Sequence, residues 1–348
     1  MAPRAKLARR RTARWQRLDD EALLDVRLCE LGLTLEGSHL AESVDELQSD
    51  LRERGLKRFK PRFWLSSDWF SPDGLAGVAL PFYLAHPRLV RLERRLMQTV
   101  EGGGADARRK LLRHEVGHAI DNAYRLHERR GWREHFGAFS TPYEPHYRPQ
   151  PHSRAFVQHL PHWYAQSHPA EDFAETFAVW LQPESTWRRR YQGWPALKKL
   201  EYVDRLMREL SARAPRDGTR GTYEPLEELD VTLRDYYEVK RRRYAVRFPF
   251  AFDRGLRRAF ARALPGDRRL SAAKFLRRMR PELVRRVLNV SDTNAYTVEQ
   301  VLHDMIQRAR ELRLVVDSSS LSARLDAAVL LASQTMNFQH TGYHRVAR

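Results

Sequence analysis

The sequence has only one cysteine, Cys29, among its 348 residues. One cysteine cannot form a disulfide within the chain, and a chain of this length can bury a core without one. No stretch approaches the roughly 18 consecutive apolar residues that a membrane-spanning helix needs. The basic N-terminal segment also lacks the apolar stretch of a secretory signal, although a transit-like segment is an alternative interpretation. These absences predict a cytoplasmic protein without a transmembrane segment.

Positive charge is abundant but unevenly distributed. The net charge is +18. Residues 1–18 hold seven basic residues and no acidic one, and residues 231–348 hold 24 basic and 11 acidic residues. Subtracting the +7 and +13 of these segments from the total leaves −2 for residues 19–230. Because opposite charges attract at long range, any attraction to a polyanion is predicted for the two flanks rather than for the middle.

The length predicts more than one structural unit, since single domains usually hold 100 to 200 residues. A stretch rich in Pro, Gly and charged residues interrupts the apolar periodicity and is the best linker candidate. The predicted division is a basic tail at residues 1–18, a first domain at 19–213, a linker at 214–225 and a basic helical region at 226–348.

Apolar residues recur at helical spacing through most of the sequence, but this pattern is interrupted near residues 60–85. The segments FWLSSDWF and GVALPFYLA in this stretch are punctuated by Pro and Gly and predict short strands. Upstream, Ser43 and Glu46 match the S-x-x-E capping box and predict a helix start. The predicted fold class is therefore α+β, mainly helical, with a small sheet and a basic helical C-terminal extension.

The most informative motif is H-E-V-G-H at residues 114–118. Residues four apart share one face of a helix, so His114 and His118 can bind the same metal ion, with Glu115 beside them to meet a water molecule. Apolar residues at helical spacing predict that the opposite face is buried. Gly117 costs a helix about 1 kcal/mol relative to Ala, which predicts that another segment packs closely against it.

Two histidines leave a zinc site one protein ligand short, because a catalytic zinc usually has three. Glu171 and Glu175 lie four apart on a helix predicted to begin just after Pro169. One carboxylate can bind the metal while the other orients a ligand imidazole. The spacing does not decide between them, and two solvated glutamates on a surface helix are the alternative.

These residues carry a resemblance to known proteins. The pattern H-E-h-G-H-A-h-D, followed by Tyr-x6-Glu-x-x-Ala-Glu-x-Phe, resembles the catalytic domain of anthrax lethal factor and related zincins over roughly residues 110–181. It is more similar to a bacterial family of zinc-binding metallopeptidases that carry a related S-H-P-x-E-D-(F/W)-A-E-T segment. The resemblance implies a zincin-like core. It also implies roles for six residues: His114, His118 and Glu171 as zinc ligands, Glu115 as general base, Tyr164 near the oxyanion and Glu175 as the orienting carboxylate.

Two further residues are candidates near this site. Asp121 follows His118 by three residues and is a candidate to orient its imidazole, although an ordinary helix salt bridge explains it equally well. His168 precedes Glu171 by three residues and is a candidate for a contact that supports a metal ligand. A direct metal ligand, a substrate contact and a residue at the helix start are the alternatives.

The predicted function is a zinc-dependent hydrolase that cleaves a peptide or amide bond. The basic flanks would suit a peptide or protein substrate with acidic character. The alternative is a non-catalytic zincin-fold module whose basic helices grip a polyanion such as nucleic acid. Nucleic acid is the less favoured partner, because the sequence has no zinc finger, RNP-like segment or Gly-rich phosphate loop. A pure scaffold would also have no need for Glu115.

Overall fold

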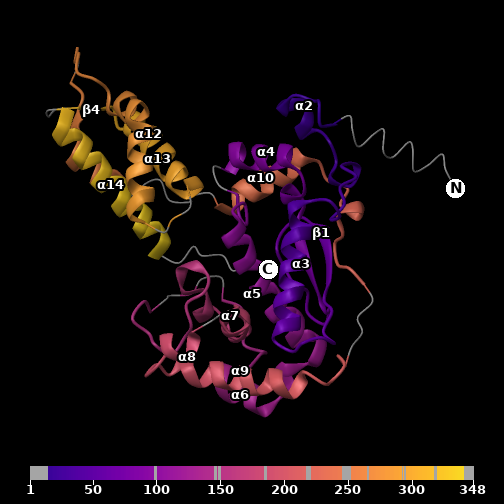
Figure 1. The fold of residues 1–348 in the computed structure, drawn as a ribbon. Helices are drawn as coiled ribbons and strands as arrows, with labels where there is room; N and C mark the ends of the chain where they lie inside the picture. Colours follow the sequence, from indigo (N-terminus) through magenta and orange to yellow (C-terminus); the bar gives the residue numbers. More distant parts are fainter. Residues whose placement is uncertain are drawn as a thin grey trace. The chain divides into compact units, whose positions relative to one another are not determined.

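The chain forms two compact units in a computed structural model (Figure 1). The N-terminal unit comprises Met1–Leu96 and Val100–Tyr237, and the C-terminal unit comprises Met97–Thr99 and Glu238–Arg348. The structure describes residues 15–97, 100–144, 147, 150–183, 186–216, 221–244, 252–264, 266–291, 293, 295–316 and 320–340. Most of the predicted basic tail and part of the predicted linker lie outside these ranges, and the domain boundaries expected from the sequence stay predictions.

The N-terminal unit is mainly helical, as predicted. Its α-helices are α2 (Asp20–Leu24), α3 (His39–Glu53), α4 (Pro87–Met97), α5 (Ala105–Tyr124), α6 (Arg130–Phe136), α7 (Pro169–Leu181), α8 (Trp187–Arg190), α9 (Ala196–Leu210) and α10 (Leu233–Tyr244), the last of which continues into the C-terminal unit. Short 3-10 helices cover Leu28–Glu30, Phe82–Ala85, Leu126–Glu128, Pro161–Gln166 and Leu226–Glu228.

The small sheet lies near residues 60–85, where the sequence predicted short strands. Strand β1 (Arg62–Ser66) pairs in parallel with β2 (Gly77–Pro81), in a register that places Trp64 opposite Ala79. All five residues of β2 are buried, and this strand contacts α5. A strand buried on both faces reads as a continuous apolar run, which GVALP is. The sheet therefore forms part of the support for α5.

The predicted capping box is wrong. Helix α3 begins at His39 after Ser38, so Ser43 lies inside the helix. The Ser43 hydroxyl donates to the carbonyl of His39 and accepts from Nε of Arg108. Leu40, one turn earlier, is fully buried. Tertiary burial of that earlier turn extends the helix upstream of the local signal, since packing overrides weak terminal preferences.

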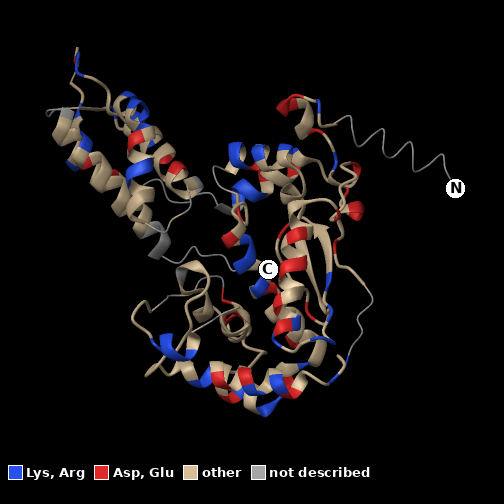
Figure 2. Ribbon diagram, in the orientation of Figure 1, with Lys and Arg blue, Asp and Glu red and all other residues tan. Residues whose placement is uncertain are grey.

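The C-terminal unit is a helical cluster around an apolar core. It holds α11 (Asp253–Ala259), α12 (Ala272–Val290), α13 (Ala295–Glu311) and α14 (Ser320–His340), with the two-residue strands β3 (Ala261–Arg262) and β4 (Leu314–Val315) pairing antiparallel. Leu276, Leu302 and Leu331, from three different helices, are all fully buried. Basic residues are spread along these helices in Figure 2.

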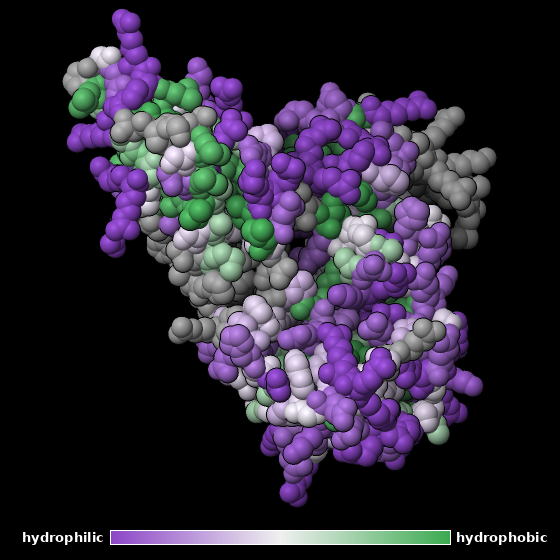
Figure 3. Space-filling view, turned by 60° about the vertical axis from the view of Figure 1, so that its left-hand side comes forward, coloured by the Kyte–Doolittle hydropathy of each residue, from purple (hydrophilic) through white to green (hydrophobic). Residues whose placement is uncertain are grey.

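Helix α14 is apolar on two faces. Ala323, Ala327 and Leu331 recur every four residues and are buried in the core, whereas Leu321, Leu325, Val329 and Met336 are exposed. Hydrophobic patches are visible among the hydrophilic side chains on the face shown in Figure 3. None of the helices in the described ranges combines the length and apolar character that crossing a membrane requires.

Candidate metal centre

Close packing of α5 against α7 builds the site. In α5 nearly every residue from Leu112 onward is buried, and in α7 every residue after Pro169 is buried. A methyl group at Gly117 would lie only 2.8 Å from Cα of Ala174 and 3.0 Å from its carbonyl oxygen. Gly117 therefore allows the two backbones to approach, as its position within a helix predicted. This approach brings the α5 histidines to the α7 glutamates.

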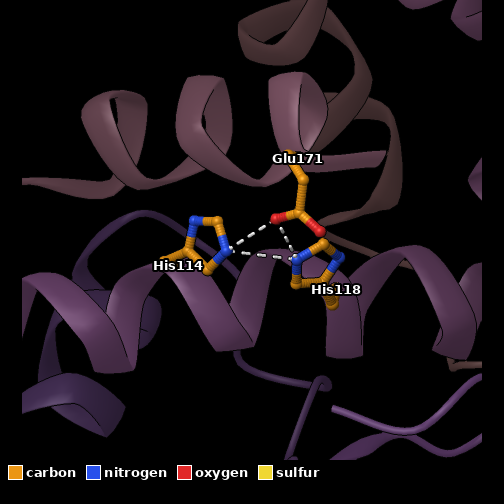
Figure 4. Close-up of side chains that lie close together, drawn as sticks. All are labelled: His114, His118 and Glu171. Atoms are coloured by element: carbon orange, nitrogen blue, oxygen red, sulfur yellow. Dashed lines mark hydrogen bonds and ion pairs between the residues drawn. The ribbon is translucent and has the colours of Figure 1, made fainter. Parts of the chain in front are cut away.

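Three side chains from these helices converge on one point (Figure 4). Oε2 of Glu171 lies 3.0 Å from Nε2 of His114 and 3.1 Å from Nε2 of His118. The two imidazole Nε2 atoms lie 3.2 Å apart. Donors held about 2.05 Å from a tetrahedral zinc ion lie about 3.3 Å from one another. These three donor atoms form a group that could hold a metal ion, and their type and separations fit zinc.

Glu175 decides which nitrogen of His114 faces the centre. Its Oε1 lies 2.9 Å from Nδ1 of His114, and its Oε2 accepts from the backbone N–H of Leu160 at 2.8 Å. A buried carboxylate at this distance requires a proton on Nδ1, so Nε2 is the ring nitrogen that faces Glu171 and the one available to a metal. Because Glu175 is fully buried, its carboxylate holds the ring in one tautomer and one orientation.

The electrostatics of this cluster favour a cation. Burial alone would lower the pKa of His114, but Glu171 and Glu175 outweigh it and raise that pKa well above its usual value. Burial would likewise raise the pKa of Glu171, yet His118 and His114 hold it well below its usual value. A buried group of two carboxylates and two imidazoles thus stabilises positive charge at its centre. A divalent cation meets that requirement.

Glu115 is placed to act on a water molecule. Its side chain is 8% exposed, and no group in the described part of the chain donates a hydrogen bond to its carboxylate. Burial raises its pKa, and the neighbouring His114 and His118 partly offset that increase. A carboxylate with a raised pKa and a free oxygen is a better proton acceptor from water than an ordinary surface glutamate.

Tyr164 lies beside the histidines. Its ring centroid is 5.5 Å from that of His114. Burial, together with the Glu171 and Glu115 carboxylates, raises its pKa well above the usual value, so the hydroxyl stays protonated. No described residue hydrogen-bonds to this hydroxyl. The preceding Trp163 has φ of +55°, a left-handed conformation that costs a non-glycine residue about 1–2 kcal/mol and is typical of functional sites.

The other two candidates have partners away from the three converging donors. Nδ1 of His168 accepts from the backbone N–H of Ala170, so Nε2 carries the proton and donates to the carbonyl of Thr141 at 2.6 Å. His168 therefore caps α7 with both ring nitrogens occupied. Asp121 accepts from the backbone N–H of His127 at 2.8 Å and contacts its Nδ1 at 3.2 Å. A role of Asp121 toward His118 stays a prediction.

Sequence reasoning missed Tyr143. Its hydroxyl donates to Oε1 of Glu171 at 2.9 Å, and its ring stacks on His168 with centroids 3.7 Å apart. Burial and the Glu171 carboxylate raise its pKa, so the phenol remains a donor. Tyr143 lies in the long segment between α6 and α7, and connections of such length inside a compact domain are usually functional. No spacing relates Tyr143 to either helix, so the sequence could not single it out.

Comparison with known proteins agrees with this geometry. No curated protein and no solved structure matches the chain. The narrower resemblance to the catalytic domain of lethal factor therefore stays a prediction. Residues 107–192, which are 86 of the 348 and hold most of α5 and all of α7, match the family described as putative zinc-binding metallo-peptidase, and this part of the chain is similar to that zinc-binding family.

Proposed function

We propose that the protein is a zinc-dependent hydrolase that cleaves a peptide or amide bond. The observation that carries the proposal is the convergence of His114, His118 and Glu171 next to the Glu115 carboxylate, to which no described residue donates a hydrogen bond. In this proposal the three donors hold zinc, and Glu175 keeps His114 in the binding tautomer. Bound zinc would supply an acidified water and polarise the substrate carbonyl. The family similarity over residues 107–192 supports the same class of activity.

The remaining chemistry belongs to two side chains. The Glu115 carboxylate takes a proton from the attacking water and is positioned to pass it to the leaving amine. The Tyr164 hydroxyl donates a hydrogen bond to the carbonyl oxygen as negative charge develops there. Both groups are partly or largely shielded from bulk water, which strengthens each interaction in the transition state.

The primary test is Glu115→Gln. The variant should bind one zinc ion per chain as the wild type does, because Glu115 is not among the three converging donors. It should lose about 10²–10⁴-fold in peptide hydrolysis, the usual contribution of a general base. Glu201→Gln, at an exposed position of α9, is the matched control and should keep the wild-type rate. Wild-type turnover by Glu115→Gln on fluorogenic peptides would refute the assignment.

A second test separates the two glutamates of α7. Glu171→Ala removes a donor of the candidate centre and should lower zinc retention far more than Glu175→Ala. The latter removes only the partner of His114, a change that typically costs about 10–100-fold in affinity. Metal analysis of the purified variants after dialysis against a chelator measures the difference. The reverse order would assign Glu175 as the third ligand.

The substrate proposed is a peptide or protein with acidic character, because the flanks of the chain are basic. The same charge supports a second candidate function, the gripping of a polyanion. On α12, Lys274, Arg277, Arg278 and Arg285 are exposed, and none has an acidic partner among the described residues. Metal-free protein that binds nucleic acid in a strongly salt-dependent manner, with no peptide hydrolysis when zinc is restored, would favour this candidate.

A further inference from the structure

We infer that Tyr143 is a positioning residue of the metal centre. Its hydroxyl holds one oxygen of Glu171 in a hydrogen bond, so that only the other oxygen can bind the metal. The inference rests on the proposed function and adds a residue that the resemblance did not supply. It concerns the segment that precedes α7, from which no metal-site residue before Tyr164 was expected.

The two oxygens of Glu171 have separate partners. Oε2 faces both imidazole Nε2 atoms, at 3.0 Å and 3.1 Å. Oε1 accepts from the Tyr143 hydroxyl at 2.9 Å. Because this carboxylate is almost completely buried, an oxygen without a donor would pay the desolvation cost of an unmet hydrogen bond. The phenol removes that cost and at the same time stops the carboxylate from rotating.

Tyr143 is itself fixed in place. Its ring lies nearly parallel to that of His168, at an interplanar angle of 15°. His168 cannot turn, because one ring nitrogen caps α7 and the other donates to the carbonyl of Thr141, two residues before Tyr143. The segment carrying Tyr143 is therefore attached to the start of the helix that carries Glu171. The phenol and the carboxylate keep their relative position through this attachment.

The hydrogen bond from Tyr143 would control the coordination number of the bound metal. A carboxylate can bind a metal through one oxygen or through both, and a catalytic zinc site needs a position left open for water. With Oε1 occupied by Tyr143, only Oε2 points at the imidazoles. Without the phenol, both oxygens would be available to the metal, and the second would compete for the open position.

The test is Tyr143→Phe, which removes the hydroxyl and keeps the ring that stacks on His168. Zinc affinity, measured by competition with a chromogenic chelator, should fall about 10–100-fold, the usual effect of losing a partner of a ligand. Tyr124→Phe is the matched control, because it removes one tyrosine hydroxyl hydrogen bond, to the carbonyl of Arg213, at the far end of α5. It should bind zinc within about twofold of the wild type.

The visible absorption spectrum of the cobalt(II)-substituted protein is a second measurement, and a loss of stability alone would not change it. The wild-type and Tyr124→Phe proteins should show the intense visible absorption of four-coordinate cobalt, and Tyr143→Phe the weaker absorption of a higher coordination number. Unchanged zinc affinity and an unchanged cobalt spectrum in Tyr143→Phe would overturn the inference. Failure of the proposed function would look different: His114→Ala would bind zinc as tightly as the wild type, or zinc-loaded wild type would hydrolyse no peptide.

Discussion

The two units differ in what they bury. Among the described residues of the N-terminal unit, the buried aspartate, glutamate and histidine side chains are Glu93, His114, Glu115, Asp121, His159, His168, Glu171, Asp172 and Glu175. Among the described residues of the C-terminal unit, Lys240 alone is ionisable and buried, and the other buried polar side chains there are threonines. Apart from Lys240, the described charged side chains of the C-terminal unit are at least partly exposed, although this unit is the more basic of the two.

The two units therefore differ in the free-energy cost of their buried side chains. Burying an ionisable group costs several kcal/mol unless it is paired and hydrogen-bonded. Six of these nine residues lie on α5 and α7, and four of the six (His114, Glu115, Glu171 and Glu175) belong to the candidate metal centre. An apolar core such as that of the C-terminal unit carries no such cost. We therefore expect substitutions to show two different energetic regimes in one chain.

The largest contrast should come from removing one partner of an ion pair in each unit. Lys199 lies 2.5 Å from the buried Asp172 and over the ring of Phe156. Lys199→Met leaves a buried carboxylate unpaired and should lower the free energy of unfolding by about 3–5 kcal/mol. Arg280→Met, at a more exposed pair with Glu299 in the C-terminal unit, should cost about 1 kcal/mol or less.

Chemical denaturation of the two variants measures this contrast. Lys198→Met, at the exposed neighbouring position, is the control and should change stability by no more than about 0.5 kcal/mol. Equal costs for Lys199→Met and Arg280→Met would break the comparison, since the pair with Asp172 would then behave as a surface pair.

The second contrast tests the apolar core. Leu302→Ala in α13 creates a cavity at a fully buried position and should destabilise the C-terminal unit by about 2–5 kcal/mol. Zinc affinity should be unchanged, because every residue of the candidate centre lies in the N-terminal unit. Leu321→Ala on the exposed face of α14 is the control, with an expected change within about 0.5 kcal/mol. A loss of zinc affinity in Leu302→Ala would show that the units are not energetically separate.

A smaller effect on stability is expected at the contact between α5 and α7. Gly117→Ala should cost about 1–3 kcal/mol by overpacking against Ala174, offset by about 1 kcal/mol of helix propensity. The zinc affinity should nevertheless fall, because separating the helices moves Glu171 away from the histidines. Gly104→Ala, where an added methyl meets no atom within 4 Å, is the control for isothermal titration with zinc. Equal zinc binding by the two variants would contradict this role.

The smallest contrast is in pH dependence, where the two units should respond in opposite directions. In the N-terminal unit, the hydrogen bond between His127 and Asp121 raises the pKa of His127. This interaction therefore stabilises the protein below about pH 6.5 and is lost as pH rises through the folded-state pKa. Arg269 lowers the pKa of Asp267, so that interaction is present above the usual aspartate pKa and is lost on acidification.

Unfolding curves of His127→Asn and Asp267→Asn between pH 3 and pH 8 check both signs. The His127→Asn deficit should be less than about 1 kcal/mol and should disappear toward pH 8. The Asp267→Asn deficit should be fully present above about pH 4 and should begin to shrink as pH falls below that value, because the folded-state pKa lies well below the usual one. A His127→Asn deficit that grows with pH would mean that the pair with Asp121 does not favour the charged imidazole.

Local patterns predicted the class of fold, and within one helix they predicted the residues that the structure brings to the candidate metal centre. His114, Glu115 and His118 share one helix, and the periodicity around them predicted its burial. Contacts between two segments far apart in the sequence could not be predicted from local patterns. The choice of Glu171 over Glu175 came from a resemblance, because residues four apart share one face of a helix and spacing alone does not choose between them.

Other failures have the same physical origin. Ser43 carried a local capping signal, but the burial of Leu40 extended α3 upstream. Tyr143 reaches Glu171 from 28 residues away along the chain, and no helical or strand period links such positions.

The sequence by itself determined the candidate metal ligands His114 and His118 and the helix that presents them, because ligand type and a four-residue repeat are local properties of one segment. Only the tertiary structure decided which glutamate oxygen faces the imidazoles, which histidine caps a helix and which tyrosine holds the third donor. Those assignments depend on how closely α5 and α7 approach each other, and that distance is set by packing between residues far apart in the chain.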